Sequence, residues 1–165
     1  MSAEGAARAD ARFVLRHPAH FIAFGGGVGL VPFAPGTFGT LLALPLHWLA
    51  TAYLAAPLYL AALAGLFALG VWACGVTERA LRQPDCGAMV WDEITAFLLV
   101  LFFTPANVYW QALAFVLFRF FDIVKPPPIR YYERMFKGGF GVMVDDIVAA
   151  FYALVVLAIV RAVAG

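Results

Sequence analysis

The sequence has few of the charged side chains with which soluble proteins cover their surfaces. Asp, Glu, Lys and Arg make up 13% of its 165 residues, against a usual share of about 25%. Hydrophobic residues reach 64%, well above the roughly 45–50% of a soluble domain. A chain of this composition could not cover its own surface in water, which excludes a soluble enzyme, a disordered tail and a nucleic-acid-binding protein. The composition predicts an integral membrane protein.

Cysteine and histidine are also scarce. The two cysteines, Cys74 and Cys86, form neither a disulfide framework nor a metal-ligand spacing. No arginine stands six positions after either of them, so the Cys-x5-Arg loop of cysteine-dependent phosphatases is absent. The three histidines all lie in the first third of the chain, away from the main acidic clusters. This placement argues against a phosphohistidine mechanism.

The N-terminal residues lack the order of a secretory signal peptide, in which an apolar core directly follows a charged start. Residues 1–20 instead mix acidic, basic and histidine side chains. Arg8, Arg12 and Arg16 recur at helical spacing and could face anionic headgroups at the cytoplasmic surface. We therefore expect either an interfacial segment or a loosely ordered basic tail over residues 1–20, followed by one membrane-embedded domain over residues 21–165.

Long apolar runs predict helices that cross a membrane, for which about 20 residues are needed. The apolar run at residues 94–118 is interrupted at residues 104–107. It therefore forms either one kinked span or two short half-helices that re-enter the membrane. The runs at residues 40–55 and 57–76 form a helical hairpin with a tight turn at residues 55–57. The expected fold is all-α, a small polytopic bundle of roughly four to five membrane helices. The runs cover residues 40–55, 57–76, 94–118 and 147–160.

Most charges fall into two connections between these runs, over residues 78–93 and 119–146, while the turns at 55–57 and 104–107 carry none. If the hairpins form, both connections emerge on the same side as the N-terminus. Lys and Arg concentrate on that side, as the positive-inside rule requires for the cytoplasmic face. The sequence thus predicts a polar site at the cytoplasmic rim of the bundle.

Acidic residues stand where the apolar runs begin or end. A carboxylate at the edge of a membrane is costly unless it is paired or bound to a cation, which makes such residues candidates for a functional site. An acid in the first helical turn also complements the helix dipole, so a structural role stays open. One acid per helix would satisfy that role, and adjacent pairs therefore favour function. The candidates are Asp92, Glu93, Asp122, Asp145 and Asp146.

Oxygen ligands without nearby His or Cys select a hard cation, above all Mg²⁺, which uses carboxylates together with water and substrate phosphate. All five acids are candidate ligands for it. Basic side chains that can bind phosphate, Arg119, Lys125 and Arg130, bracket Asp122. The positive-inside bias alone would also place basic residues here, but Lys125 is held between Asp122 and three prolines. The combination predicts phosphoryl chemistry.

Two glycine-rich stretches, residues 25–29 and 138–141, precede apolar helices. A glycine loop ahead of a helix can direct backbone N–H groups at an anion. Neither stretch matches a P-loop or a dinucleotide-binding motif, and in the first one small residues would equally allow close helix packing. Both interpretations stay open, although Thr37 and Thr40, which follow the first stretch, favour contact with phosphate.

Four motifs follow one another along the chain. They are GVGLVPFAPGTFGT at residues 27–40, VWDE at 90–93, FRFFDIVKPPPIR at 118–130 and KGGFGVMVDD at 137–146. In this order and spacing they resemble the phosphatidylglycerophosphatase A family, over about residues 20 to 155. The sequence departs from the usual family pattern in having Lys-Pro-Pro-Pro for Lys-Pro-Trp-Pro and Glu133-Arg134 for Asp-Arg. Both departures leave the principal carboxylates intact.

The resemblance implies a Mg²⁺-dependent phosphatase of the bacterial inner membrane, multi-pass, with its active site at the cytoplasmic face. It would remove the terminal phosphate of the membrane lipid phosphatidylglycerophosphate to give phosphatidylglycerol, a step of phospholipid biosynthesis. A covalent aspartyl-phosphate intermediate competes with direct attack by water. The implied roles are Mg²⁺ binding by Asp92, Asp122 and Asp146, orientation or deprotonation of water by Glu93 or Asp145, and neutralisation of phosphoryl oxygens by Arg119, Lys125 and Arg130.

Two alternatives remain from the residues alone. The charges do not distinguish this lipid from another phosphomonoester such as phosphatidate. A non-enzymatic cation or phosphate transport protein would use similar acids, but it would place them across the depth of the membrane. The acids of this sequence collect at one rim, which favours the phosphatase.

Overall fold

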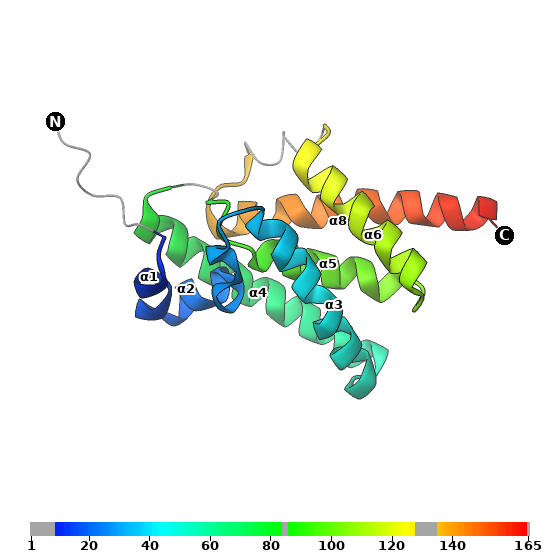
Figure 1. The fold of residues 1–165 in the computed structure, drawn as a ribbon, viewed down its shortest axis with the longest axis horizontal. Helices are drawn as coiled ribbons and strands as arrows, with labels where there is room; N and C mark the ends of the chain where they lie inside the picture. Colours follow the sequence, from blue (N-terminus) through cyan, green and yellow to red (C-terminus); the bar gives the residue numbers. More distant parts are fainter. Residues whose placement is uncertain (1–8, 84–85, 128–134, 165) are drawn as a thin grey trace.

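The computed structural model describes residues 9–83, 86–127 and 135–164, and within these ranges the chain forms helices and no strand. This agrees with the predicted all-α class. Five long helices and three six-residue elements follow one another in the described residues (Figure 1). They are α1 (Ala11–Arg16), α2 (Pro18–Ala23), the 3-10 segment η1 (Gly25–Leu30), α3 (Pro35–Tyr53), α4 (Ala56–Leu81), α5 (Trp91–Phe103), α6 (Val108–Val124) and α8 (Gly138–Ala164).

Two hairpins organise the bundle. The first joins α3 to α4 at the predicted turn, because α3 ends at Tyr53 and α4 begins at Ala56. The second is the interrupted run at residues 94–118, which forms two helices, α5 and α6, that fold back on each other (Figure 1). Pro105 follows the end of α5, and the Asn107 side chain accepts a hydrogen bond from the Tyr109 N–H at 2.8 Å to begin α6. A single kinked span is therefore wrong for this segment.

Helix α5 is the centre of the bundle. It packs against α3, α4, α6 and α8, and the side chains of Phe97, Val100 and Leu101 along it are completely buried. Phe97 stacks on Phe118 of α6 with ring centroids 5.4 Å apart. Because α5 is covered on all sides, polar groups in its first turn are held on a rigid support.

Helix α8 begins at Gly138, nine residues before the predicted start at Ile147. Its glycines, expected to form a loop, lie in the first turn, and Gly139 packs against the backbone of α4. A methyl group at Gly139 would overlap the Val71 carbonyl oxygen and the backbone of Gly75. The two helices thus cross with their backbones in contact, as small residues allow in membrane bundles. In the first glycine stretch, Gly29 lies against the backbone of Ala88 in the connection between α4 and α5.

This crossing makes a testable prediction about stability. We expect Gly139→Ala to lower the stability of the fold by about 1–3 kcal/mol, because the added methyl group must displace the backbone of α4. Gly65→Ala is the matched control, since Gly65 lies in α4 with open space around its Cα and alanine favours a helix by up to about 1 kcal/mol. Thermal unfolding in detergent measures both, and equal melting temperatures for the two variants would contradict the crossing.

The segment before η1 is packed onto the bundle. Phe13 and Val14 of α1 and Ala19 and Ala23 of α2 are buried. The His20 ring Nδ1 lies 3.0 Å from the Thr77 hydroxyl of α4. Residues 11–20, the described helical part of the segment 1–20 expected to be an interfacial segment or a basic tail, thus belong to short helices that run to residue 23 and cover the end of α4.

Two helices are long and apolar enough to cross a membrane, Ala56–Leu81 in α4 and Gly138–Val163 in α8. Helix α5 has 13 residues and spans only about 20 Å, less than the roughly 30 Å of a hydrocarbon core. The predicted number of four to five spans stays a prediction.

Candidate active site

A pocket of about 280 Å³ lies where the starts of α3, α5 and α8 meet the end of α6. The chain brings all five acidic candidates and two of the three basic candidates to its walls. Arg130 lies outside the described residues. The polar lining consists of Asp92, Glu93, Asp122, Asp145, Asp146, Arg119 and Lys125, with Ala34, Pro35, Gly36, Gly87, Met89, Ile123 and Val142 completing the walls.

The positions of the acids within their helices bear on why they are there. Asp92 and Glu93 occupy the first turn of α5, where a helix dipole favours negative charge. Asp145 and Asp146 lie about two turns inside α8, too far from its first residue for capping. Asp122 lies in the last turn of α6, where the dipole disfavours an acid. Helix capping therefore accounts for only one of the three groups, and the expectation that both pairs begin a helix is wrong for Asp145 and Asp146.

Three of the carboxylates converge. Oxygen atoms of Asp92, Glu93 and Asp146 lie within 4.8 Å of one another. Glu93 Oε2 and Asp146 Oδ2 are buried and have no hydrogen-bond partner, which is costly for a charged oxygen. A set of oxygen donors at this spacing fits a hard cation such as Mg²⁺.

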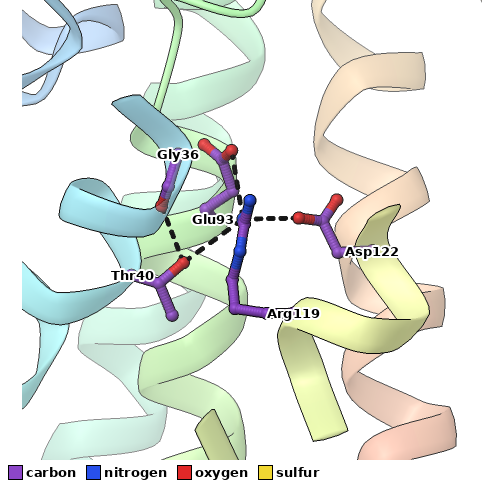
Figure 2. Close-up of polar contacts among 5 residues, drawn as sticks. All are labelled: Gly36, Thr40, Glu93, Arg119 and Asp122. Carbon is purple, nitrogen blue, oxygen red and sulfur yellow. Dashed lines mark hydrogen bonds and ion pairs between the residues drawn. The ribbon is translucent and has the colours of Figure 1, made fainter. Parts of the chain in front are cut away.

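Arg119 connects the acids of α5 and α6 (Figure 2). Its Nη1 lies 2.5 Å from Asp122 Oδ2 and 3.4 Å from Glu93 Oε1. The same nitrogen lies 3.5 Å from the Thr40 hydroxyl, which itself donates to the Gly36 carbonyl at 2.8 Å. Both ion pairs are largely shielded from solvent. Arg119 is thus fixed from three sides at the wall of the pocket.

The two predicted threonines do not line the pocket. Thr40 is completely buried behind Arg119, and Thr37 contributes a backbone N–H that donates to Ala34 at 2.9 Å. Gly36, which sequence reasoning missed, is closer to the chemistry. A methyl group there would overlap Glu93 Oε1, so the start of α3 approaches this carboxylate closely and any larger residue would require the Glu93 side chain to move. The motif that contains Pro35, Gly36 and Thr37 was correctly identified as part of the site, but the threonines were predicted to line the pocket where Gly36 does.

Lys125 reaches the other side of the pocket. Its Nζ lies 3.6 Å from Asp145 Oδ2. Its backbone ends α6 in the left-handed region, with φ of 45°, and Ala34, which also lines the pocket, has φ of 46°. Such values are uncommon for residues other than glycine and cost about 1–3 kcal/mol each. Two strained residues at one pocket are typical of a functional site.

Five acidic and two basic side chains line the pocket, so acidic groups are in excess by three. Burial, followed by the neighbouring Asp146 and Asp122, raises the pKa of Glu93 to about 8, although Asp92 and Arg119 act in the opposite direction. Crowded carboxylates in a shielded site favour either a bound proton or a bound cation. The described residues thus form an acidic cage with two fixed cations at its rim, suited to binding a metal ion and a phosphate together.

Comparisons with known proteins agree with this chemistry. A family model described as phosphatidylglycerophosphatase A matches residues 21–161. Phosphatidylglycerophosphatase A of Haemophilus influenzae is 41% identical over 144 residues, covering 87% of this chain and 88% of that protein. The Escherichia coli protein of the same name is 41% identical over 143 residues, covering 86% and 82%.

A third relative carries a different name. It is a Bacteroides thetaiotaomicron protein with the provisional name phosphatidylinositol-3-phosphatase, 43% identical over 152 residues, covering 87% of this chain and 94% of that protein. No solved structure matches the chain. The similarity therefore extends over nearly the whole chain in proteins named for phosphate removal from lipids.

Proposed function

The chain belongs to the phosphatidylglycerophosphatase A family, and we propose on this premise that it hydrolyses phosphatidylglycerophosphate to phosphatidylglycerol and phosphate with Mg²⁺ as cofactor. The observation that carries the proposal is the pocket, in which five carboxylates and two cations converge at one end of an apolar bundle. A phosphomonoester at headgroup depth needs such a site above helices that accommodate acyl chains. The reaction would serve phospholipid biosynthesis.

Asp92, Glu93 and Asp146 are the residues that would hold Mg²⁺, because their oxygens converge and two of these oxygens lack other partners. When bound, the ion would neutralise phosphoryl oxygens and lower the pKa of a coordinated water. Asp122 is paired with Arg119 and positions that cation. Asp145 lies outside the converging group of three, with its Oδ2 beside Lys125 Nζ, and is the acid that meets the attacking water. This assignment narrows the five candidate ligands to three.

Each of the remaining polar side chains has a separate role in the proposed hydrolysis. Arg119 and Lys125 bind the phosphoryl oxygens and orient the ester. Asp145 orients the attacking water and accepts its proton as the water oxygen bonds to phosphorus. The bond between phosphorus and the glycerol oxygen breaks, and this oxygen takes up the proton that Asp145 accepted, directly or through a water molecule, so that the alcohol and inorganic phosphate are released. A phospho-enzyme trapped by acid quenching would instead indicate the aspartyl-phosphate route.

The surface of the molecule supports a membrane location. Large apolar side chains are exposed on α3, α4, α6 and α8, among them Trp48, Leu58, Val116, Phe151 and Ile159, and exposed apolar area of this extent marks contact with a membrane or a partner. Two helices are long enough to span a bilayer. We place the protein as a multi-pass protein of the bacterial inner membrane, with the pocket at the cytoplasmic face where the basic residues collect.

The experiment is phosphate release by the purified full chain in detergent. We expect release from phosphatidylglycerophosphate with Mg²⁺, none after EDTA, and recovery when Mg²⁺ is added back. Phosphatidate and phosphatidylinositol 3-phosphate are the comparison substrates, the second because of the name of the third relative. Equal or faster release from either would overturn the substrate assignment, and release unchanged by EDTA would overturn the metal assignment.

A further inference from the structure

A second cavity lies at the end of the bundle opposite the acidic pocket. It has a volume of about 700 Å³ and is formed by the turn between α5 and α6 and the second half of α8. Figure 1 shows this turn and the C-terminal end of α8 on the same side of the molecule, away from the start of α8. The proposed reaction does not use this cavity. Its walls are Phe103, Thr104, Pro105, Trp110 and residues of α8 from Phe151 to Ala162.

The lining of this cavity is apolar except at its rim. Phe103 and Phe151 are 58% and 63% exposed, so the groove is open along its side to the medium around the bundle. The Thr104 hydroxyl, a polar group in the wall, already donates to the Val100 carbonyl at 2.8 Å. Arg161, the one charged side chain of the lining, is exposed in the last turn of α8. The groove thus combines an apolar slot with a single cation at its outer end.

We propose that this groove binds one anionic phospholipid, from the leaflet opposite the catalytic pocket, with an acyl chain in the slot and the headgroup phosphate on Arg161. The inference rests on the membrane placement proposed above. Arginine binds phosphate oxygens in a bidentate manner, so Arg161 at the outer end of an apolar slot complements the charge of an anionic headgroup. Trp110 in the wall is an aromatic ring of the kind found at membrane interfaces. The turns at residues 54–55 and 104–107 carry no charged side chain. Arg161 would therefore determine the preference for an anionic headgroup at this end of the bundle.

Fluorescence quenching tests the proposal because Trp110 lines the groove. The full chain is reconstituted in phosphatidylcholine vesicles containing a fixed fraction of brominated phosphatidylglycerol or brominated phosphatidylcholine. The difference between wild type and Trp110→Phe isolates the emission of Trp110. We expect at least twofold stronger quenching of Trp110 by the brominated anionic lipid. Arg161→Gln should abolish this preference.

Arg79→Gln is the matched control, because Arg79 is an exposed arginine in the last turn of α4, at the other end of the bundle, and the preference should persist in it. Equal quenching by both lipids, or a preference retained in Arg161→Gln, would overturn the proposal. So would a Trp110 that neither lipid quenches, which would indicate a second copy of the chain in the groove.

Native mass spectrometry of unsubstituted and Arg161→Gln protein from mixed micelles provides a second readout that needs no tryptophan variant. Retention of phosphatidylglycerol over phosphatidylcholine should fall in Arg161→Gln. Neither measurement uses phosphate release, so failure of the proposed reaction and failure of the lipid site give different results.

Discussion

Asp146→Asn is expected to reduce phosphate release from phosphatidylglycerophosphate by about a hundred- to a thousandfold. Loss of one carboxylate from the group Asp92, Glu93 and Asp146 removes a ligand for the metal ion, whose stabilisation of the transition state amounts to several kcal/mol, and each 1.36 kcal/mol is a factor of ten in rate. The measurement is kcat and KM over a range of Mg²⁺ concentrations. Asp92→Asn should have an effect of the same order.

The same substitution should leave the fold at least as stable in the absence of metal. Asp146 is 4% exposed, and it lies among other carboxylates with one oxygen that lacks a partner. A neutral side chain of equal shape removes repulsion at this point. Glu78→Gln is the control, because Glu78 lies in α4 and does not line the pocket, and its activity should equal that of wild type. Full activity of Asp146→Asn, or a lowered melting temperature together with lost activity, would contradict the assignment.

The sequence predicted the acids of this site well because the membrane makes charge placement informative. Carboxylates beside apolar runs are costly, so Asp92, Asp122 and Asp146 stood out without any knowledge of contacts. Their convergence followed from the hairpins, which return each charged connection to the same end. The ion pairs between side chains of the pocket could not be predicted from the sequence. Nothing in the chain indicates that Arg119 pairs with Glu93, 26 positions away, since this contact depends on the packing of α5 against α6.

The beginning of α8 shows why another part of the fold could not be predicted. Glycine permits positive φ and close approach of the backbone, so the sequence predicts a loop at residues 138–141 ahead of an apolar helix. Glycine is also unfavourable in a helix by roughly 1 kcal/mol relative to alanine. In the folded chain Gly139 permits contact between the backbones of α8 and α4, and this packing outweighs the local preference. Likewise the hydropathy of residues 94–118 is the same for one kinked span or a hairpin. The choice depends on contacts that only the folded chain reveals.

Arg119→Gln is expected to reduce both activity and stability. The substitution leaves Glu93 and Asp122 with less compensation in a site where their side chains are only 13% and 11% exposed, and breaking a buried pair by removing one partner costs about 3–5 kcal/mol. It also removes a phosphate-binding cation from the pocket wall. We expect a lower melting temperature and a large loss of kcat/KM, measured in detergent with saturating Mg²⁺.

A double variant separates the two effects of Arg119. In Arg119→Gln/Asp122→Asn the acid at 2.5 Å from Arg119 is neutralised together with its partner, so most of the lost stability should return because no uncompensated charge remains at that position. Activity should not return, since the cation that binds phosphate is still absent. Arg119→Lys keeps the charge without the planar fork of donors, and it should retain stability better than activity. Recovery of activity in the double variant would show that Arg119 acts only by holding Asp122, and that the phosphate is bound elsewhere in the pocket.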